Sequence, residues 1–515
     1  MKHDIKTALT VFTCLIITIS LFERRGQTAS GVLSDDQKAI SLVRTALALI
    51  DSAKPRTASI HAAGEWLWSN EGLSPEQPTR TMRLNAEWEV DFQNKRFLQR
   101  SAGYLGKEMI WCSQITLARE ITYSLFCHSN VFSSYGPQKT GEGWTYRMDT
   151  TYPDPYWHLA HALEQSQSLR LEGQSAIGGV REDVISYTDE FRRHHLLFLN
   201  SKTHLLRQVS SDARITRLGD GFVPRIIFQD YHRTGSFWTP AKVSIVENSF
   251  VMMTSNLQTI RRDFDRTASY SRFAPPPNAR EVNQKELEFH VSQVAKSVYF
   301  VENASPDYNC MFVVFADYVL VVEAPLSDNV SAKVMAAIHE TAPGKPIKYV
   351  VATHFHEDHI GGLRAYLRAG AALVTTPGNL QFMDLFVRKL KTTEPNVNLS
   401  PVEVVADRRQ FTDGEVTVDL LTIASPHADE MLVPVIASDG VVYVADGFTR
   451  DWGPWRPLTV EERVLARQFK NLGLKIRLLL LGHGPATTQI DLDRYLSSTV
   501  TQPRSRSGIT FNRQK

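Results

Sequence analysis

The chain has 515 residues, enough for two or three domains of roughly 100–200 residues each. A hydrophobic content of 43% and a charged content of 22% are those of an ordinary soluble globular protein. The 57 basic and 55 acidic residues give a formal net charge of +2, which supports neither a nucleic-acid-binding surface nor a polybasic membrane surface.

A basic start and a short apolar stretch open the chain. Lys2 and Lys6 precede the uncharged residues 7–22, a stretch slightly shorter than the roughly 17–25 apolar residues of a membrane span. Thr28-Ala29-Ser30 offers a small-x-small cleavage site, so residues 1–30 are predicted to be a secretory signal peptide. We therefore expect a periplasmic or secreted protein. A membrane anchor through residues 7–22 and a cytoplasmic protein are the alternatives.

The next region is predicted to be β-rich. Residues 34–53 start with Ser-Asp-Asp and carry apolar residues at helical spacing, which predicts a first helix. From about residue 57 to 270, apolar and polar residues alternate between turn residues, which is typical of antiparallel sheet with one solvated face. One helix interrupts this pattern near residues 154–168. Together these features predict an N-terminal domain over residues 31–273.

The cysteines and histidines of this region leave alternatives open. Cys112 and Cys127 lie in apolar, strand-like runs that could pair and form a disulfide in an oxidising compartment. Two buried free thiols are the alternative. No Cys-x-x-Cys occurs, so we expect no thiolate zinc site. Four histidines have no carboxylate or cysteine cluster beside them in the sequence and are interpreted as structural or surface residues: His158, His161, His194 and His195.

A change of pattern follows three consecutive prolines. Residues 275–277 cannot continue a helix or a central strand, so residues 274–290 are predicted to be a linker. Beyond it, fully apolar strand-like runs alternate with helical segments at about 328–341, 361–370, 379–391 and 457–472. Such runs indicate a sheet buried on both faces, as in a layered α/β domain. We place this domain at residues 291–500, followed by a loose basic tail at 501–515.

Metal-binding residue types gather at strand ends in this domain. The segment "THFHEDHIGG", residues 353–362, directly follows an apolar run. His354 and His356 alternate across the strand end onto one side, and the next turn brings Asp358 and His359 toward the same point. Ligands in such domains gather just past strand ends, and three more runs end in a donor: His427, Asp446 and His483. Imidazole and carboxylate without thiolate suit Zn²⁺ and would also accept Fe or Mn.

The pattern His-x-His-x-Asp-His-x-Gly-Gly, then a lone His, an Asp and Gly-His-Gly, resembles the metallo-β-lactamase-fold hydrolase superfamily over roughly residues 290–490. Stretches such as "VVFADYVLVVEAPLS" and "SPHADEMLV" are similar to one bacterial subgroup of exported metallohydrolases, in which a β-rich domain similar to a lipoprotein-carrier half-barrel comes first. The resemblance implies a four-layer αββα fold and a two-metal site. The first metal would be held by His354, His356 and His427, and the second by Asp358, His359 and His483, with Asp446 bridging both.

Three positions qualify this resemblance. Glu323 in "VVEAP" stands where many members carry an Asp that supports a metal ligand without touching the metal, and it is one methylene longer. Pro426 precedes His427 where others often carry a small residue, so this loop should be stiffer. Glu357 matches a variable position and is predicted to be solvated or substrate-facing, not a ligand.

The implied chemistry is hydrolysis of a small molecule. A hydroxide bridging two metal ions would attack a carbonyl or phosphoryl group, while Asp358 or a metal-bound water passes a proton to the leaving atom. An aspartate bridge in place of Cys or Ser favours an ester, lactone or thioester substrate over typical β-lactamase activity. A mononuclear iron persulfide dioxygenase would leave His359 and His483 unused, and a metal-free scaffold would be expected to have lost ligands. A role of the N-terminal domain in binding a lipid or another apolar ligand is compatible with hydrolysis.

Overall fold

The computed structural model describes residues 34–51, 53–105, 108–118, 121–126, 131–135, 142–211, 224–247, 250–263, 280–282, 287–448, 458–488 and 493. The predicted signal peptide or anchor, the prolines of the linker and the C-terminal tail lie outside these residues. Within the described part, no helix combines the length and the apolar character that a membrane crossing requires.

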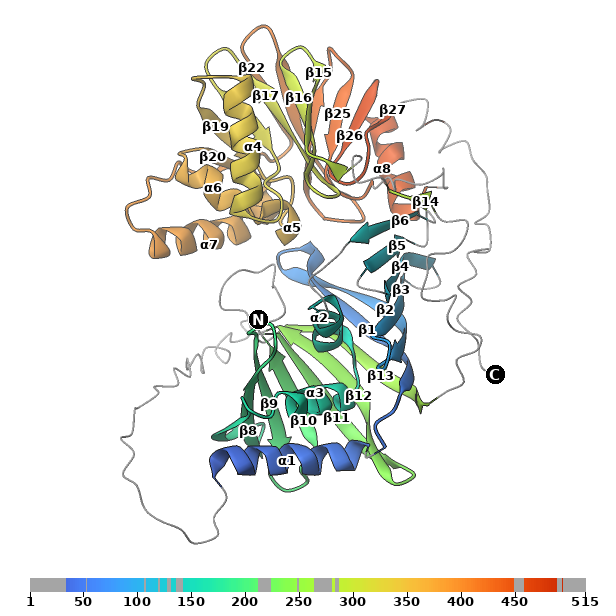
Figure 1. The fold of residues 1–515 in the computed structure, drawn as a ribbon. Helices are drawn as coiled ribbons and strands as arrows, with labels where there is room; N and C mark the ends of the chain where they lie inside the picture. Colours follow the sequence, from blue (N-terminus) through green and yellow to red (C-terminus); the bar gives the residue numbers. More distant parts are fainter. Residues whose placement is uncertain are drawn as a thin grey trace, which may run out of the picture.

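The N-terminal domain is one curved, 14-stranded sheet with helices on one face (Figure 1). Its spatial order is β14-β6-β5-β4-β3-β2-β1-β13-β12-β11-β10-β9-β8-β7, and only the β14–β6 pair is parallel. The strands are β1 (Thr57–Ser74), β2 (Gln77–Asp91), β3 (Arg96–Leu105), β4 (Glu108–Ala118), β5 (Ile121–Phe126), β6 (Val131–Tyr135), β7 (Arg170–Ile177), β8 (Val180–Thr188), β9 (His194–Asn200), β10 (Leu206–Ser211), β11 (Pro224–Thr234), β12 (Phe237–Glu247), β13 (Phe250–Arg262) and β14 (Arg280–Glu281).

Three helices fill the concave side of this sheet: α1 (Asp35–Ile50), α2 (Glu142–Thr151) and α3 (Pro155–Glu164). A capping box on Ser34 starts α1, and its apolar stripe packs with α3 against strands β7 to β12. The prediction of a single interrupting helix was wrong, because α2 precedes α3. The apolar side chains of α2, Trp144 and Met148, pack under β1 to β4. Two apolar side chains are too few to show a helical period in this segment, so the sequence did not predict α2.

The C-terminal domain contains two further sheets. The first has the order β15-β16-β17-β18-β19-β20-β21 and the second the order β22-β23-β24-β25-β26-β27. Their strands are β15 (His290–Ala295), β16 (Val298–Ser305), β17 (Tyr308–Val314), β18 (Val319–Val322), β19 (Ile347–Val351), β20 (Ala372–Thr375), β21 (Glu403–Val404), β22 (Arg408–Thr412), β23 (Thr417–Ile423), β24 (Met431–Ile436), β25 (Val441–Val444), β26 (Leu478–Leu481) and β27 (Thr487–Thr488).

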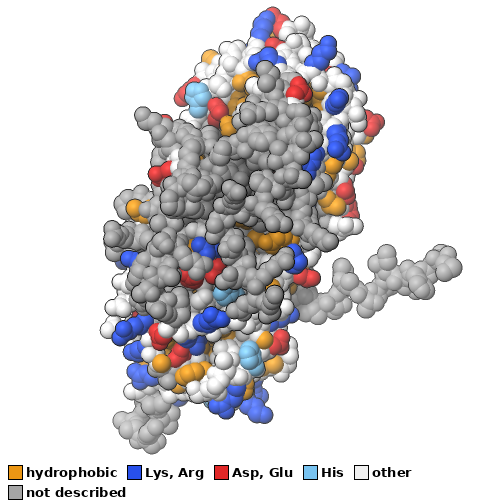
Figure 2. Space-filling view, turned by 90° about the vertical axis from the view of Figure 1, so that its right-hand side faces the viewer, with side chains coloured by type: hydrophobic (Ala, Val, Ile, Leu, Met, Phe, Trp, Pro, Cys, Tyr) orange, Lys and Arg blue, Asp and Glu red, His pale blue; other side chains and the backbone are white. Residues whose placement is uncertain are grey.

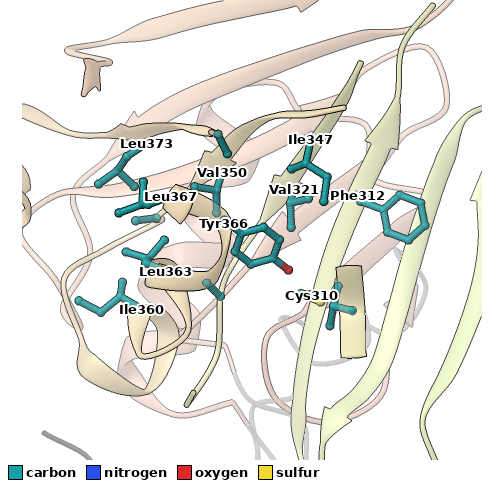
Figure 3. Close-up of a cluster of buried hydrophobic side chains, with 14 of the residues drawn as sticks. Cys310, Phe312, Val321, Ile347, Val350, Ile360, Leu363, Tyr366, Leu367 and Leu373 are labelled. Carbon is teal, nitrogen blue, oxygen red and sulfur yellow. The ribbon is translucent and has the colours of Figure 1, made fainter. Parts of the chain in front are cut away.

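Helices cover the outer faces of the two sheets. They are α4 (Asp328–Thr341), α5 (Glu357–Ile360), α6 (Leu363–Arg368), α7 (Pro377–Thr393) and α8 (Val460–Asn471). One core lies between the first sheet and α4 to α7; in Figure 3, Leu363, Tyr366 and Leu367 of α6 lie over strands β18 to β20. A second core lies between the sheets, and a third lies under α8. The layers are therefore α, β, β and α, as predicted.

Two sequence expectations concern the surface and the cysteines. On the face shown in Figure 2, Lys and Arg side chains are interspersed with Asp and Glu side chains, in keeping with the near balance of charge. Cys112 is disulfide-bonded, which excludes the free-thiol alternative for this residue. Its predicted partner, Cys127, lies outside the described residues. Cys310 is a buried free thiol.

Candidate metal centre

All seven predicted donors meet in two groups at one edge of the two sheets. The first group is His354, His356, His427 and Asp446, and the second is Asp358, His359, Asp446 and His483. Within each group the donor atoms lie within 4.8 Å of one another, and Asp446 belongs to both. Glu357 belongs to neither group.

The fold places each donor just past a strand. His354 follows β19, and the next turn carries His356 as the N-cap of α5, with Asp358 and His359 inside that short helix. Parallel pairing of β25 with β26 brings Asp446 and His483 to the same edge. His427 follows β23, in a loop where the Ser425 hydroxyl accepts the backbone N–H groups of His427 and Ala428.

Asp446 lies at the centre of the histidines. Its Oδ2 is 3.0 Å from His359 Nε2, 3.0 Å from His427 Nε2 and 3.6 Å from His354 Nε2. Its other oxygen, Oδ1, is 3.1 Å from His483 Nε2. His356 Nδ1 lies 2.8 Å from His427 Nε2. Five imidazoles thus direct a ring nitrogen at the surroundings of one buried carboxylate.

The opposite ring nitrogen of four of these histidines has a protein partner. His356 Nε2 donates to the carbonyl of Gly72 at 2.9 Å, and His483 Nδ1 donates to the carbonyl of Asp307 at 2.8 Å. His354 Nδ1 is 2.9 Å from the Thr353 hydroxyl, and His359 Nδ1 contacts Glu323 Oε2. These contacts fix ring orientation and turn the other ring nitrogen toward the centre, as metal-ligating histidines require.

Two buried polar atoms among the donors have no hydrogen-bond partner: His354 Nε2 and Asp358 Oδ1. A buried polar atom without a partner costs about 1–3 kcal/mol. Both atoms belong to the donor groups, where a metal ion would satisfy them. This donor set of imidazole and carboxylate oxygen fits a divalent metal.

The electrostatics of the centre favour bound positive charge. Burial lowers the pKa values of His354 and His356, which keeps these imidazoles neutral. Burial acts the same way on His359 and His483, but the nearby carboxylates outweigh it, raising the pKa of His359 well above its usual range and that of His483 to about 9. Burial raises the pKa of Asp446, but the charges on the surrounding histidines outweigh it and hold that pKa well below its ordinary value.

Glu323 supports a donor from behind. It directly follows β18, is fully buried and has a φ of 77°, a left-handed conformation that costs a non-glycine residue about 1–2 kcal/mol. Its Oε2 contacts His359 Nδ1, and its Oε1 accepts the Thr353 N–H at 3.3 Å. The structure therefore places Glu323 behind His359 and outside both donor groups.

The two glycines of the motif allow close packing behind α5. A Cβ on Gly361 would lie 2.2 Å from the carbonyl oxygen of Leu326, and one on Gly362 would lie 2.1 Å from Ser331 Oγ. The loop before α4 is hydrogen-bonded to the same segment, because Ala324 N donates to His359 O and Gly362 N donates to Ala324 O. Only glycine permits this approach.

We expect Gly361→Ala to lower the free energy of unfolding by about 1–3 kcal/mol, because the new methyl group must push two backbone segments apart. Metal content should fall with it, since the displaced segment carries three of the donors. Thermal unfolding and metal analysis measure both effects. Gly178→Asn, in a turn with open space and a φ of 59° that asparagine tolerates, is the control. An unchanged melting temperature in Gly361→Ala would contradict the close contact.

Sequence reasoning missed the turn between β16 and β17. Asp307 accepts from His483 through its carbonyl, and its Oδ1 accepts the Gly484 N–H at 3.0 Å. The neighbouring Tyr308 hydroxyl donates to Asp358 Oδ2 at 3.3 Å, and its ring packs edge-on against His483. The only signal was a Pro-Asp turn, which carries no information about a partner far along the chain.

A second polar cluster lies inside the N-terminal domain, around histidines that were interpreted as structural or surface residues. Asp149, Asp189 and His195 are buried with donor atoms within 4.8 Å of one another. Arg193 contacts Asp189 at 2.6 Å, and His161 Nε2 is 3.1 Å from Glu190. Asp149 comes from α2, whereas Asp189 and Glu190 lie in the β8–β9 turn, a few residues before His195. Arg193 also lies 3.5 Å from Asp149, and its contacts with both aspartates make the cluster an ion-pair network. His194, by contrast, is exposed.

The stability of this domain is expected to peak near pH 6.5. Burial lowers the pKa of His161, but Asp149 and Glu190 outweigh it and raise this pKa to about 9. Protonated His161 therefore contributes its full stabilisation of the folded domain below the ordinary pKa of 6.5. This contribution is lost as the pH rises through about 9. Burial lowers the pKa of His158 to about 4, so stability also falls as the pH drops from 6.5 toward 4. Melting temperatures across this range measure both slopes. His161→Gln should flatten the alkaline slope, and an equal slope in the variant would refute the assignment.

Comparisons with known proteins found a family model and solved structures similar to part of this chain. Residues 307–483 match the model of the metallo-beta-lactamase superfamily. Similar solved structures include a metallo-beta-lactamase from Pontibacter korlensis, with 16% identity, a TM-score of 0.32, and coverage of 41% of this chain and 98% of that chain. Another is a metallo-beta-lactamase from Hirschia baltica, with 15% identity, a TM-score of 0.30, and coverage of 40% and 96%.

The match of residues 307–483 to the metallo-beta-lactamase superfamily model confirms the resemblance expected from the histidine motif. The family and the His/Asp groups together support a metal-dependent hydrolase that binds divalent metal.

Proposed function

We propose that the protein is a binuclear zinc hydrolase that cleaves an ester, lactone, thioester or related bond of a small molecule. The observation that carries this proposal is the pair of donor groups sharing Asp446, with the far ring nitrogens of four histidines already held by protein partners. The ligands proposed for the first ion are His354, His356 and His427. Those for the second are Asp358, His359 and His483, with Asp446 common to both.

Two divalent ions held there would lower the pKa of a water molecule and polarise the electrophilic oxygen of the substrate. The residues of the chain supply position and proton transfer. Side chains of His427 and His483 are 12% and 13% exposed, whereas His354 and His356 are fully buried, so substrate would approach from the side of the first two.

Asp358 is the proposed proton carrier to the leaving atom. Its Oδ2 accepts from Tyr308, while its Oδ1 has no hydrogen-bond partner. The oxygen of Asp358 that does not bind the metal ion would take up the proton and pass it on. Tyr308 would hold this carboxylate in place during the transfer.

The two alternatives make different demands on the same residues. An iron persulfide dioxygenase would need one ion and would leave the second group idle, yet His359 and His483 lie 3.0 Å and 3.1 Å from Asp446. A metal-free scaffold gives no reason to keep His354 Nε2 buried without a partner. Both features favour the binuclear hydrolase.

Metal analysis of the purified protein, followed by a screen of lactones, thioesters, β-lactams and phosphodiesters, tests this function. We expect two equivalents of zinc and hydrolysis that is lost in His356→Ala. One equivalent of iron with oxygen uptake would establish the dioxygenase instead. Absence of bound metal after purification without chelators would establish the scaffold.

We further propose that the protein is exported. The basic and apolar N-terminal sequence supports this, and so does the disulfide at Cys112, because disulfides persist mainly in oxidising compartments. N-terminal sequencing of exported material should start near Ser30 or Gly31. A retained Met1 on exported material would favour the anchor through residues 7–22.

A further inference from the structure

A two-stranded arm projects from the N-terminal sheet to the metal centre. Pairing of β1 with β13 ends at Trp66, and pairing of β2 with β3 starts at Arg83. Between these points β1 and β2 pair with each other, which defines the β1–β2 arm as residues 67–82. At about 3.3 Å per residue the arm reaches roughly 25 Å from the sheet. In Figure 1 the light blue ends of β1 and β2 approach α5.

The tip of the arm contacts the two loops that carry the first donor group. The Gly72 carbonyl accepts from His356 Nε2 at 2.9 Å, and the Leu73 carbonyl accepts the Asp429 N–H at 2.7 Å, two residues beyond His427. Nearer the base of the arm, Arg80 forms an ion pair with Glu461 of α8. Three separate segments of the hydrolase domain therefore hold the arm.

An irregularity in the arm allows both tip carbonyls to face the same domain. Successive carbonyls of a regular strand point to opposite sides. Here the β1–β2 register shifts between Ser69 and Ser74, which lets Gly72 and Leu73 both accept from the hydrolase domain. Gly72 is buried against that domain, although the Leu73 side chain is 38% exposed.

A carbonyl can only accept a hydrogen bond, so His356 must carry its proton on Nε2 when it is bound to Gly72. The lone pair is then on Nδ1, the nitrogen that lies 2.8 Å from His427 Nε2 in the first donor group. This hydrogen bond therefore joins the N-terminal domain to a donor side chain. It selects the tautomer and the ring orientation that metal binding needs.

We infer that the β1–β2 arm is part of the metal centre, with the Gly72 carbonyl as a positioning group that keeps His356 ready for the first metal. The inference rests on the proposed function, because it treats His356 as a ligand. It assigns the N-terminal domain a direct role: the affinity of the first metal depends on the docked arm, and the affinity of the second does not.

The test uses the full chain with a shortened arm. Residues 69–79 are replaced by Asn-Gly, which joins the paired residues Trp68 and Arg80 in a two-residue hairpin turn and retains the contact of Arg80 with Glu461. Competition with a zinc chelator measures the two stepwise affinities. We expect the affinity of one site to fall by about 10–100-fold, the usual effect of losing a partner behind a ligand. The absorption spectrum of bound Co²⁺ should change at that same site.

Leu73→Ser is the matched control, because it alters the side chain of the tip and keeps both carbonyls. Its zinc affinities should equal those of the wild type. If the shortened-arm variant also binds both zinc ions with wild-type affinity, the inference is overturned. The proposed function would still stand in that case, provided that the wild type binds two equivalents of zinc. Failure of the wild type to bind zinc would instead overturn the proposed function.

A second variant addresses a shortened arm that fails to fold. Incorporating the α-hydroxy analogue of leucine at position 73 converts the Gly72–Leu73 amide to an ester, whose carbonyl is a weaker acceptor. The arm and its side chains stay in place. A selective loss of affinity at one zinc site would support the positioning role of the Gly72 carbonyl, and wild-type affinities at both sites would refute it.

Discussion

Asp446→Asn is expected to lower kcat/KM by about 10³-fold or more, equivalent to at least about 4 kcal/mol of transition-state stabilisation. The carboxylate belongs to both donor groups, and His354, His359 and His427 approach its Oδ2. An amide of the same shape has no negative charge to offset two divalent ions. Both zinc affinities should therefore fall together, which distinguishes this variant from any change confined to one group.

Asp439→Asn provides the control for this prediction. Asp439 lies at the opposite end of β25, in the turn where its carbonyl accepts from Arg477. It should retain two equivalents of zinc and full activity. Loss of only one zinc in Asp446→Asn would show that the carboxylate serves a single ion, contrary to the shared position in the structure.

Glu323→Gln is expected to weaken zinc binding by about 10–100-fold through its effect on His359. The amide oxygen can still accept from His359 Nδ1, but the negative charge that makes this imidazole a stronger ligand is lost. Breaking this buried pair should also destabilise the fold, by up to about 3–5 kcal/mol if the contact is lost altogether. Chelator competition and thermal unfolding measure these two effects separately.

Glu323→Asp separates charge from contact. It keeps the carboxylate but is one methylene shorter, so it should not reach His359 Nδ1 and Thr353 N–H together. If charge alone matters, Glu323→Asp will bind zinc better than Glu323→Gln, and if contact matters, the order will reverse. Glu340→Gln, exposed on α4, is the control. Wild-type affinity in both Glu323 variants would exclude any role for this residue behind the ligand.

Local sequence patterns account for much of the hydrolase domain. The predicted helix at 328–341 coincides with α4, and the one at 457–472 contains α8. These helices have side-chain caps and a clear apolar stripe, so their bounds follow from the local sequence. Helix α5 was missed because a four-residue helix is shorter than any reliable period.

The set of candidate ligands could also be read from the chain. Donors such as His354, Asp446 and His483 each directly follow an apolar strand, and parallel neighbours bring such ends to one edge. Residue type and position after a strand were sufficient to select these candidate ligands, because a metal site needs side chains with particular donor atoms. Which ring nitrogen each histidine presents was not readable, since it depends on partners such as Asp307 and Thr353.

By itself, the sequence predicted a layered α/β domain and the seven candidate donors, because these depend on short-range periodicity and side-chain chemistry. The tertiary structure alone decided what lies behind the donors. Gly72 is 284 residues from His356 and acts through a backbone carbonyl, a group that every residue has. Asp149 meets His195 only because α2 folds against the β8–β9 region. Contacts of this kind leave no local pattern, because only the packing of distant elements creates them.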